Sequence, residues 1–233
     1  MPRAKNGKQE KYRAIYDLIA EVYGEPQRHR HQPPVDQLVN TILSQQTTSV
    51  NRQRAFDALK ERFPSWEAVM AAGVDEVREA IRPAGLANQK APRIQNALRF
   101  VMQERGELSL DFLAEWPVQR AKKWLMQIKG VGPKTASIIL LFTFGLPAFP
   151  VDTHVHRVSR RLGLIGTKVT ADKAHEILEN IVAPEEYYPF HINLIRHGRE
   201  ICHARGPQCH VCVLQEWCDY FQGTGDWRLR IGH

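Results

Sequence analysis

The chain has 233 residues, 43% of them hydrophobic, which is enough to form a core in one or two domains. Its 32 Lys and Arg residues outnumber 25 Asp and Glu residues, and the net charge of +7 favours a polyanionic partner. This composition excludes a disordered chain, and no apolar run is long enough for a membrane span or a secretory signal. We therefore expect a cytoplasmic protein that binds nucleic acid and not membranes.

Apolar residues recur at three- and four-residue steps along most of the chain, which is the period of amphipathic helices. The first such face runs from Tyr12 to Val22, and Gly24 and Pro26 end it. The expected helical faces lie at 12–22, 34–43, 56–63, 77–81, 94–102, 118–128, 155–162, 177–181 and 192–195. The apolar segment ASIILLF at 136–142 fits a buried strand or a buried helix, and its helical neighbours favour a helix. We therefore expect an all-α protein.

The segment IKGVGPKTA at 128–136 lies between two expected helices and contains a tight turn. Gly130 and Gly132 can adopt positive φ and let a ligand approach the backbone, and the N–H groups of the following helix suit a phosphate. An ordinary glycine-capped corner between two helices explains the pattern about equally well.

Asp152 follows the apolar segment AFPV and precedes Thr153, so its carboxylate could cap the helix that begins there. A carboxylate could also stabilise positive charge that develops on a sugar carbon. Both roles can coexist.

The four cysteines lie in the last fifth of the chain, spaced C-x6-C-x2-C-x5-C. They are Cys202, Cys209, Cys212 and Cys218. This clustering indicates one metal site rather than disulfides. Four thiolates can hold zinc or an iron–sulfur cluster, and the spacing matches neither most zinc ribbons nor the ferredoxins.

GVGPKTA followed by VDTHVHR resembles the helix–hairpin–helix and Gly/Pro–Asp signature of the endonuclease III family of DNA glycosylases. Lys134 and Asp152 are 18 positions apart, as in that family, and the resemblance covers about residues 30–220. It implies a six-helix barrel domain with the hairpin at 33–146, and a second helical domain formed by 1–32 and 147–233. DNA would lie in a cleft between these domains.

The resemblance also implies the catalytic chemistry. Lys134 would attack C1′ of a damaged nucleotide, expel the base and leave a Schiff base that undergoes β-elimination on the 3′ side. The attack needs a neutral amine, and Lys129 and the helix N-terminus could supply a field that favours it. Asp152 would stabilise the developing charge and handle the proton of the lysine. Without the surrounding motif, Lys134 would be interpreted as a solvated cation at a helix start.

Reaching C1′ requires extrusion of the nucleotide and filling of the vacated space. The resemblance assigns Gln46 in SQQTT to the gap and Leu86 in AGLANQK to the opposite stack. Leu86 lies in a polar, glycine-containing loop, which favours an exposed side chain. The remaining expected DNA contacts are Gly130, Gly132, Thr135, His154 and Arg205, although a histidine such as His154 is more often structural.

The resemblance identifies the four cysteines as ligands of a 4Fe-4S cluster, in a loop at 199–219. The cluster would fix Arg199 and Arg205 for phosphate contact, with electron transfer as a secondary role.

The chain departs from the pattern of the family at several positions. Ser49 replaces an aspartate, Lys129 a proline and Pro133 a basic residue, while Gly206 and Gln208 reduce the charge of the cluster loop. These changes predict weaker phosphate contacts or an altered choice of base.

We expect a monomeric, prokaryotic, nucleoid-associated enzyme that removes oxidised pyrimidines from duplex DNA and nicks the abasic site. Uracil, thymine mismatches and activity confined to abasic sites remain open as substrates. The run Gln45–Thr47 is similar to the mismatch-adenine branch, which lacks the lysine. A cluster-bearing DNA-binding module without catalysis and a redox carrier are the alternatives from other classes.

Overall fold

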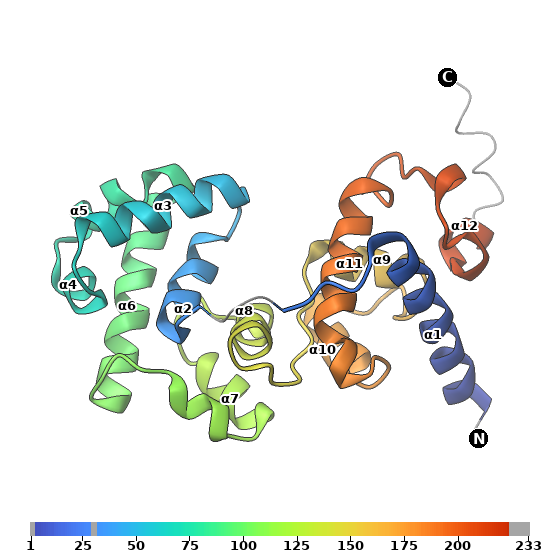
Figure 1. Ribbon diagram of the computed structural model, residues 1–233, viewed down its shortest axis with the longest axis horizontal. Coiled ribbons are helices and arrows are strands. Elements are labelled where there is room, and N and C mark those ends of the chain that lie inside the picture. The colour runs from blue at the N-terminus through green and yellow to red at the C-terminus, as the bar shows by residue number, and fades with distance from the viewer. Residues whose placement is uncertain (1–2, 29–31, 224–233) are drawn as a thin grey trace. The chain divides into compact units, whose positions relative to one another are not determined.

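The computed structural model describes residues 3–28 and 32–223, and these residues form helices and helical turns without any strand (Figure 1). The expectation of an all-α protein is therefore confirmed. The chain divides into two compact units, residues 30–146 and residues 1–29 with 147–233. None of the described helices combines the length and the apolar character that a bilayer span needs.

The unit at 30–146 is built around its longest helix, α6 (Ala87–Arg105), which packs against α2, α4 and α5 (Figure 1). Gly106 ends α6 in the left-handed region, with φ +76°, and its N–H donates to the Met102 carbonyl at 2.8 Å. The other helices and turns of this unit are α2 (Pro34–Leu43), α3 (Ser49–Arg62), α4 (Trp66–Ala71), α5 (Val74–Ala80), η1 (Arg82–Ala84), η2 (Asp111–Glu115), α7 (Val118–Leu125), α8 (Pro133–Ile138) and η3 (Ile139–Phe144).

The apolar segment at 136–142 is helical. It begins in α8 and continues without a break into η3, a π-helical turn that ends at Gly145. Ala136, Ile139 and Leu140 are fully buried, so this segment forms a core helix as expected.

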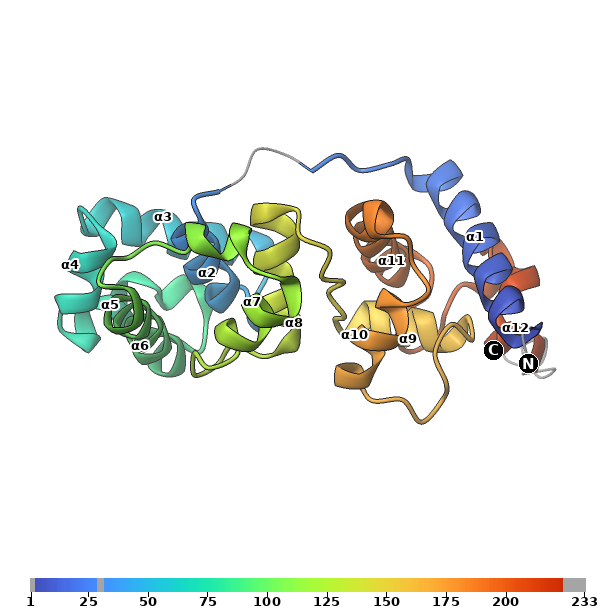
Figure 2. The same ribbon diagram turned by 90° about the horizontal axis from the view of Figure 1, so that it is seen from below.

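The other unit is held together by α9 (Thr153–Arg161) and α11 (Tyr187–Glu200), which pack on each other, with α1 (Arg3–Tyr23) against α11. Figure 2 shows α1 beside α12, where Lys11 forms an ion pair with Asp219. The remaining elements of this unit are α10 (Ala171–Glu179), η4 (Pro184–Glu186), η5 (Cys209–Val211), η6 (Gln215–Trp217) and α12 (Asp219–Gly223).

The expected face of the first helix was wrong at its last position. Val22 is 49% exposed, whereas Tyr16, which was not assigned to this face, is 5% exposed. Tyr16 is buried because its ring packs against Phe190 of α11. The partner helix therefore determines which residues of α1 are buried.

Candidate functional site

The hairpin between α7 and α8 is a tight turn built on Gly130. The Val131 N–H donates to the Ile128 carbonyl at 2.9 Å, and Gly130 has φ +92°. A positive φ at the third position of such a turn is typical of type II, and glycine adopts it without steric cost. The Gly130 carbonyl accepts a hydrogen bond from Gln45 Nε2 at 3.2 Å.

Gly132 does not share this conformation, so the expectation of positive φ was wrong there. Its φ is −97° and its ψ −176°, the extended backbone of the N-cap of α8. The physical reason is local, because an N-cap is extended and Pro133 disfavours the helical region for the residue before it. No atom lies within 4 Å of the place a Cβ would occupy at Gly132, so the backbone can be approached there.

Lys134 is exposed in the first turn of α8, and Thr135 beside it is buried. The helical hydrogen bonds of α8 start at Ala136, whose N–H donates to the Gly132 carbonyl at 3.0 Å. Because N–H groups at a helix start lack intrahelical acceptors, those of Lys134 and Thr135 are the ones suited to an anion. Any contact of Thr135 with DNA is therefore expected from its backbone.

Two loops lie in the same unit as the hairpin: the Gln46 loop, residues 44–48 between α2 and α3, and the Leu86 loop, residues 85–86 between η1 and α6. Both residues have positive φ, +50° and +49°, and they are the non-glycine residues with this conformation among the described residues. Gln46 is exposed and Leu86 is 43% exposed, as expected for the leucine. Arg93 donates to Gln45 Oε1 at 3.2 Å, and Gln45 in turn donates to Gly130. The Gln46 loop and the hairpin are thus physically connected.

Asp152 is the N-cap of α9, which confirms the first of the two roles expected for it. Its Oδ1 accepts the Val155 N–H at 2.8 Å. The segment before it is buried and held by two histidines. His175 Nδ1 donates to the Phe149 carbonyl at 2.8 Å, and His191 Nδ1 donates to the Pro150 carbonyl at 2.9 Å. The position of the carboxylate is therefore constrained on both sides.

His154 is the second residue of α9, two positions after the N-cap Asp152, and it lies against Gly198 of α11. Arg157 donates from NH2 to His154 Nδ1 at 3.1 Å and to the Gly198 carbonyl at 2.8 Å. Burial lowers the pKa of His154 below its ordinary value, and Arg157 and Arg199 lower it further, against the opposing effect of Asp152. Its Nδ1 is an acceptor, so the proton of the neutral ring is on Nε2.

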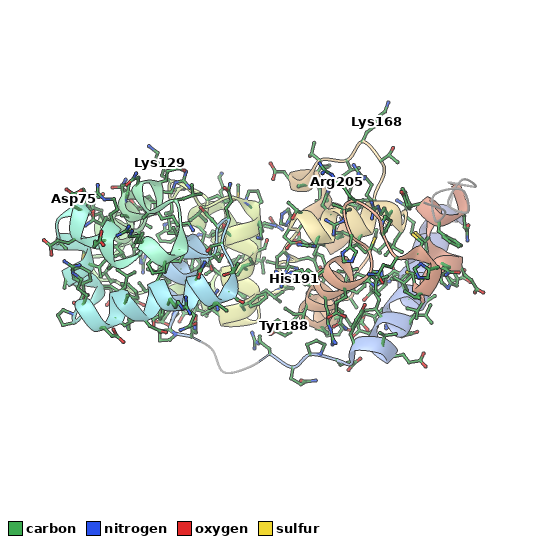
Figure 3. The ribbon with its side chains drawn as sticks, turned by 90° about the horizontal axis from the view of Figure 1, so that it is seen from above. Asp75, Lys129, Lys168, Tyr188, His191 and Arg205 are labelled. Atoms are coloured by element: carbon green, nitrogen blue, oxygen red, sulfur yellow. The ribbon has the colours of Figure 1, made fainter. Side chains whose placement is uncertain are left out.

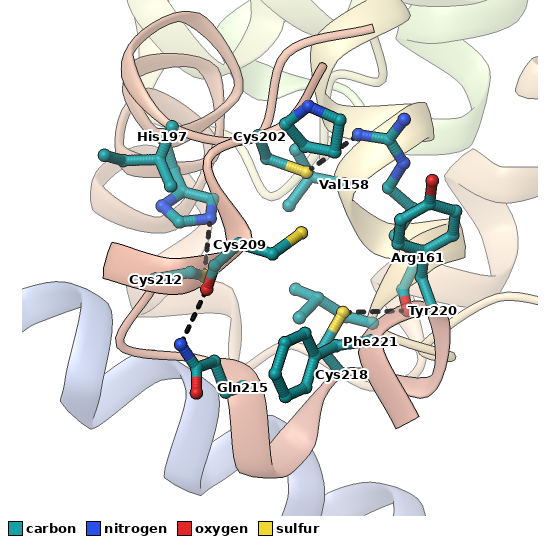
Figure 4. A pocket seen from close by; sticks show the side chains of 13 residues that line it. Val158, Arg161, His197, Cys202, Cys209, Cys212, Gln215, Cys218, Tyr220 and Phe221 are labelled. Atoms are coloured by element: carbon teal, nitrogen blue, oxygen red, sulfur yellow. Dashed lines mark hydrogen bonds between the residues drawn. The ribbon is translucent and has the colours of Figure 1, made fainter. Parts of the chain in front are cut away.

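The four cysteines line one pocket with apolar residues of α9 and α12 (Figure 4). Arg161 donates from NH1 to Cys202 Sγ at 3.2 Å, and His197 Nε2 lies 3.6 Å from Cys212 Sγ. Within the ranges described, no three His, Cys, Asp or Glu side chains are grouped as ligands of a single ion. Four thiols in an apolar pocket, with N–H donors directed at the sulfurs, are a donor set that fits a thiolate-bound metal group.

Burial raises the pKa of Cys212 to about 11, and it also raises the pKa of Cys209 and Cys218. A metal group bound here would displace the thiol protons. Arg199 and Arg205, the expected phosphate contacts of this loop, are both exposed, and Figure 3 labels Arg205.

Comparisons with known proteins agree with this set of features. Residues 39–184 match the HhH-GPD superfamily of base excision DNA repair proteins. The chain is 32% identical to the endonuclease III of Thermotoga maritima over 205 residues, which are 88% of this chain and 92% of that protein. The chain belongs to the endonuclease III family. As a member of that family it is a DNA glycosylase of base excision repair.

Two solved endonuclease III structures have the same fold. A non-covalent endonuclease III–DNA complex has a TM-score of 0.78 and 30% identity, covering 95% of this chain and 98% of that chain. A trapped covalent endonuclease III–DNA intermediate has a TM-score of 0.77 and 30% identity, covering 92% and 97% of the two chains.

The expected site residues are distributed over the two units of the chain. Gln46, Leu86 and Lys134 belong to the unit at 30–146, whereas Asp152 and the cysteines belong to the other.

Several residues that hold the site were missed by the sequence analysis. They are Arg93 beside the hairpin, His175 and His191 behind Asp152, and Gly198, where a Cβ would lie 3.1 Å from His154. A polar residue on an otherwise apolar helix face was the one available signal for the two histidines, and it does not reveal the carbonyl that each contacts.

Proposed function

We propose that this chain is a bifunctional glycosylase and abasic-site lyase that removes damaged pyrimidines, first of all oxidised ones, from double-stranded DNA. It would act as a monomer, with 33–146 as the hairpin domain and 1–32 plus 147–233 as the second domain. The observation that carries the proposal is the connected group in one unit, in which an exposed Lys134 follows a hairpin bonded to the Gln46 loop.

In this proposal Lys134 Nζ, as a free amine, attacks C1′ of the extruded nucleotide. The C1′–N bond breaks, the electron pair leaves with the base, and the base takes up a proton. The C1′–O4′ bond then opens, O4′ takes up the proton that the attacking amine loses, and a C1′ imine remains. The imine acidifies the C2′ proton, and removal of that proton breaks the C3′–O bond, so that the 3′ phosphate leaves with the electron pair and the strand is nicked. The trapped covalent intermediate of a protein 30% identical to this chain supports an enzyme-linked step.

Asp152 is proposed to stabilise the positive charge that develops at the sugar and to accept a proton from the lysine. The cap on Val155 uses Oδ1, which leaves lone pairs of the carboxylate for this work. The histidines behind residues 149–150 support the proposal, because a fixed carboxylate needs no reorganisation during the reaction.

DNA is proposed to be held by three kinds of contact. The backbone of the hairpin, from Gly130 and Gly132 to Thr135, would contact a phosphate. Gln46 would occupy the space vacated by the nucleotide, and Leu86 would separate the opposite stack. His154 and Arg205 would contact phosphate or sugar.

We also propose that the four cysteines hold a 4Fe-4S cluster. When bound, such a cluster would fix the loop at 199–219, and electron transfer is the other chemistry that it can supply. Arg161 supports this assignment, since it also donates to the carbonyls of His203 and Ala204, at 2.6 and 3.1 Å, and so holds the start of the loop next to Cys202.

The test is borohydride trapping and strand nicking on duplexes that carry an oxidised pyrimidine, uracil, a thymine mismatch or an abasic site. Wild type should form a covalent adduct, and Lys134→Ala should form none. Lys123→Ala is the matched control, because Lys123 is an exposed lysine of α7, the helix that precedes the hairpin, and it should still form the adduct.

The panel also separates the alternatives. Salt-sensitive duplex binding without turnover of any substrate would overturn the catalytic proposal in favour of a DNA-binding module, and absence of DNA affinity would favour a redox carrier. Turnover of uracil or thymine mismatches alone would overturn the assignment of oxidised pyrimidines, while turnover of abasic sites alone would overturn the glycosylase step.

A further inference from the structure

Lys90, in the first turn of α6, is a lysine in the interior of the unit at 30–146. Its side chain has no exposed surface. Its Nζ donates to the Leu43 carbonyl at 2.8 Å and to the Ala84 carbonyl at 2.9 Å. Burying an ammonium group is costly unless it is hydrogen-bonded, so these two bonds account for its presence.

Both acceptors are at the ends of helical segments. Leu43 is the last residue of α2, and Ala84 is the last residue of η1. Carbonyls at a helix C-terminus lack intrahelical partners and carry partial negative charge, so a cation there is favourable. One ammonium group therefore joins the ends of two segments that are about 40 residues apart in sequence.

These ends lead directly into the two loops proposed to enter the DNA. Leu43 precedes Gln46 by three residues, and Ala84 precedes Leu86 by two. The backbone N–H of Lys90 also donates to the Leu86 carbonyl at 3.0 Å. Lys90 thus bonds to the chain at two points of this loop region, through its side chain at Ala84 and through its backbone at Leu86.

The backbone of the two loops needs such support. Gln46 and Leu86 both adopt the left-handed region, which costs a non-glycine residue free energy and persists where the surroundings impose it. One turn later on α6, Arg93 fixes Gln45. The same face of α6 therefore holds both loops.

We propose that Lys90 is a positioning residue that sets the separation between the Gln46 and Leu86 loops, so that both side chains can enter the duplex at one extruded nucleotide. This inference rests on the proposed insertion of Gln46 and Leu86. It assigns to Lys90 no contact with DNA and no part in bond breaking.

Lys90→Met tests the proposal, because methionine fills most of the same volume without donors. Base extrusion is read from 2-aminopurine placed next to the lesion, whose fluorescence rises when it unstacks. We expect extrusion and excision from the duplex to fall roughly tenfold or more, as displaced positioning groups can cause. Borohydride trapping on a single-stranded abasic site, where no stack must be opened, should stay at the wild-type level.

Gln95→Met is the matched control. Gln95 is 2% exposed on the same helix and donates to two carbonyls, those of Val69 and Ala72, at 3.0 and 2.8 Å. These carbonyls belong to the end of α4 and do not lead into a proposed DNA loop. The control should lose stability as Lys90→Met does, yet extrude the base as wild type does.

Lys90→Gln guards against a methionine variant that does not fold. The glutamine side chain is shorter, and its amide N–H can donate to one of the two carbonyls. The level of base extrusion should therefore lie between the levels of wild type and Lys90→Met. A folded Lys90→Met or Lys90→Gln that extrudes the base as well as Gln95→Met would overturn the inference. Wild-type extrusion by Gln46→Ala and Leu86→Ala would instead overturn the proposed insertion itself.

Discussion

Asp152 has a structural role and a proposed catalytic role, and two substitutions separate them. Its Oδ1 accepts the Val155 N–H at 2.8 Å and caps α9. Asparagine caps helices as well as aspartate does, so Asp152→Asn should unfold at the wild-type temperature. It lacks the negative charge, and base excision should fall roughly 10²–10³-fold, the usual effect of losing one electrostatic contact to a transition state.

Asp152→Ala removes the cap as well as the charge. Loss of an N-cap costs about 1 kcal/mol, which for a chain of this size lowers Tm by roughly 2–4 °C. Thr170→Ala is the matched control, because Thr170 Oγ1 caps α10 in the same unit by accepting the Lys173 N–H at 3.3 Å. It should lower Tm by a similar amount and leave excision unchanged.

The measurements are thermal unfolding followed by circular dichroism and single-turnover excision on a lesion duplex, both at one pH and one salt concentration. A catalytic role of Asp152 is excluded if Asp152→Asn excises the base at the wild-type rate while Asp152→Ala loses activity only in proportion to its lost stability. Asp152 would then be a helix cap and nothing more.

Three further predictions concern the hairpin, α9 and the cysteine pocket. Gly130→Ala should cost ~1–3 kcal/mol and weaken duplex binding, since Gly130 has φ +92° and its Cβ would lie 3.3 Å from Arg93. Gly106→Ala is the control, because Gly106 also has positive φ, +76°, but lies in open space; it should lower stability and leave the affinity for duplex DNA unchanged. Equal DNA affinities of the two variants in a salt titration would contradict the contact between the hairpin and DNA. Because the pKa of His154 is held below 6.5, the unfolded chain takes up the proton first, so stability should fall as the pH drops from about 6.5. His154→Gln should lose less stability than wild type between pH 7 and 5, as measured by urea unfolding. The same loss of stability in both proteins would contradict a lowered pKa of His154. Cys209→Ser should abolish the visible absorbance of a bound cluster and weaken DNA binding, and loss of absorbance with full affinity would exclude a role of the cluster in fixing the loop.

The sequence alone predicted the helices and the chemistry that depends on neighbouring residues. The three- and four-residue period identified the helical faces because each face is set by the geometry of its own segment. The cap at Asp152 followed from an aspartate placed directly before a helical pattern, and the exposure of Leu86 followed from its polar loop. The family signature likewise consists of short segments, and the comparisons confirmed the family.

Predictions failed or were missing where one segment depends on another. Val22 was assigned to the buried face of its helix, but the position of Phe190 in α11 buries Tyr16 instead. The error at Gly132 was local instead, because Pro133 after it and its place at the start of α8 give it an extended backbone unlike that of Gly130.

Only the tertiary structure revealed how the loops are held. The bond from Lys90 to the Leu43 carbonyl spans 47 residues, and the one from Gln45 to the Gly130 carbonyl spans 85. A local pattern shows that a lysine or a glutamine is present, but its acceptor is a backbone carbonyl, which every residue carries, so no residue type marks the partner. Packing of the helices determines which carbonyl comes within reach of each side chain, and these bonds connect the hairpin, the Gln46 loop and the Leu86 loop.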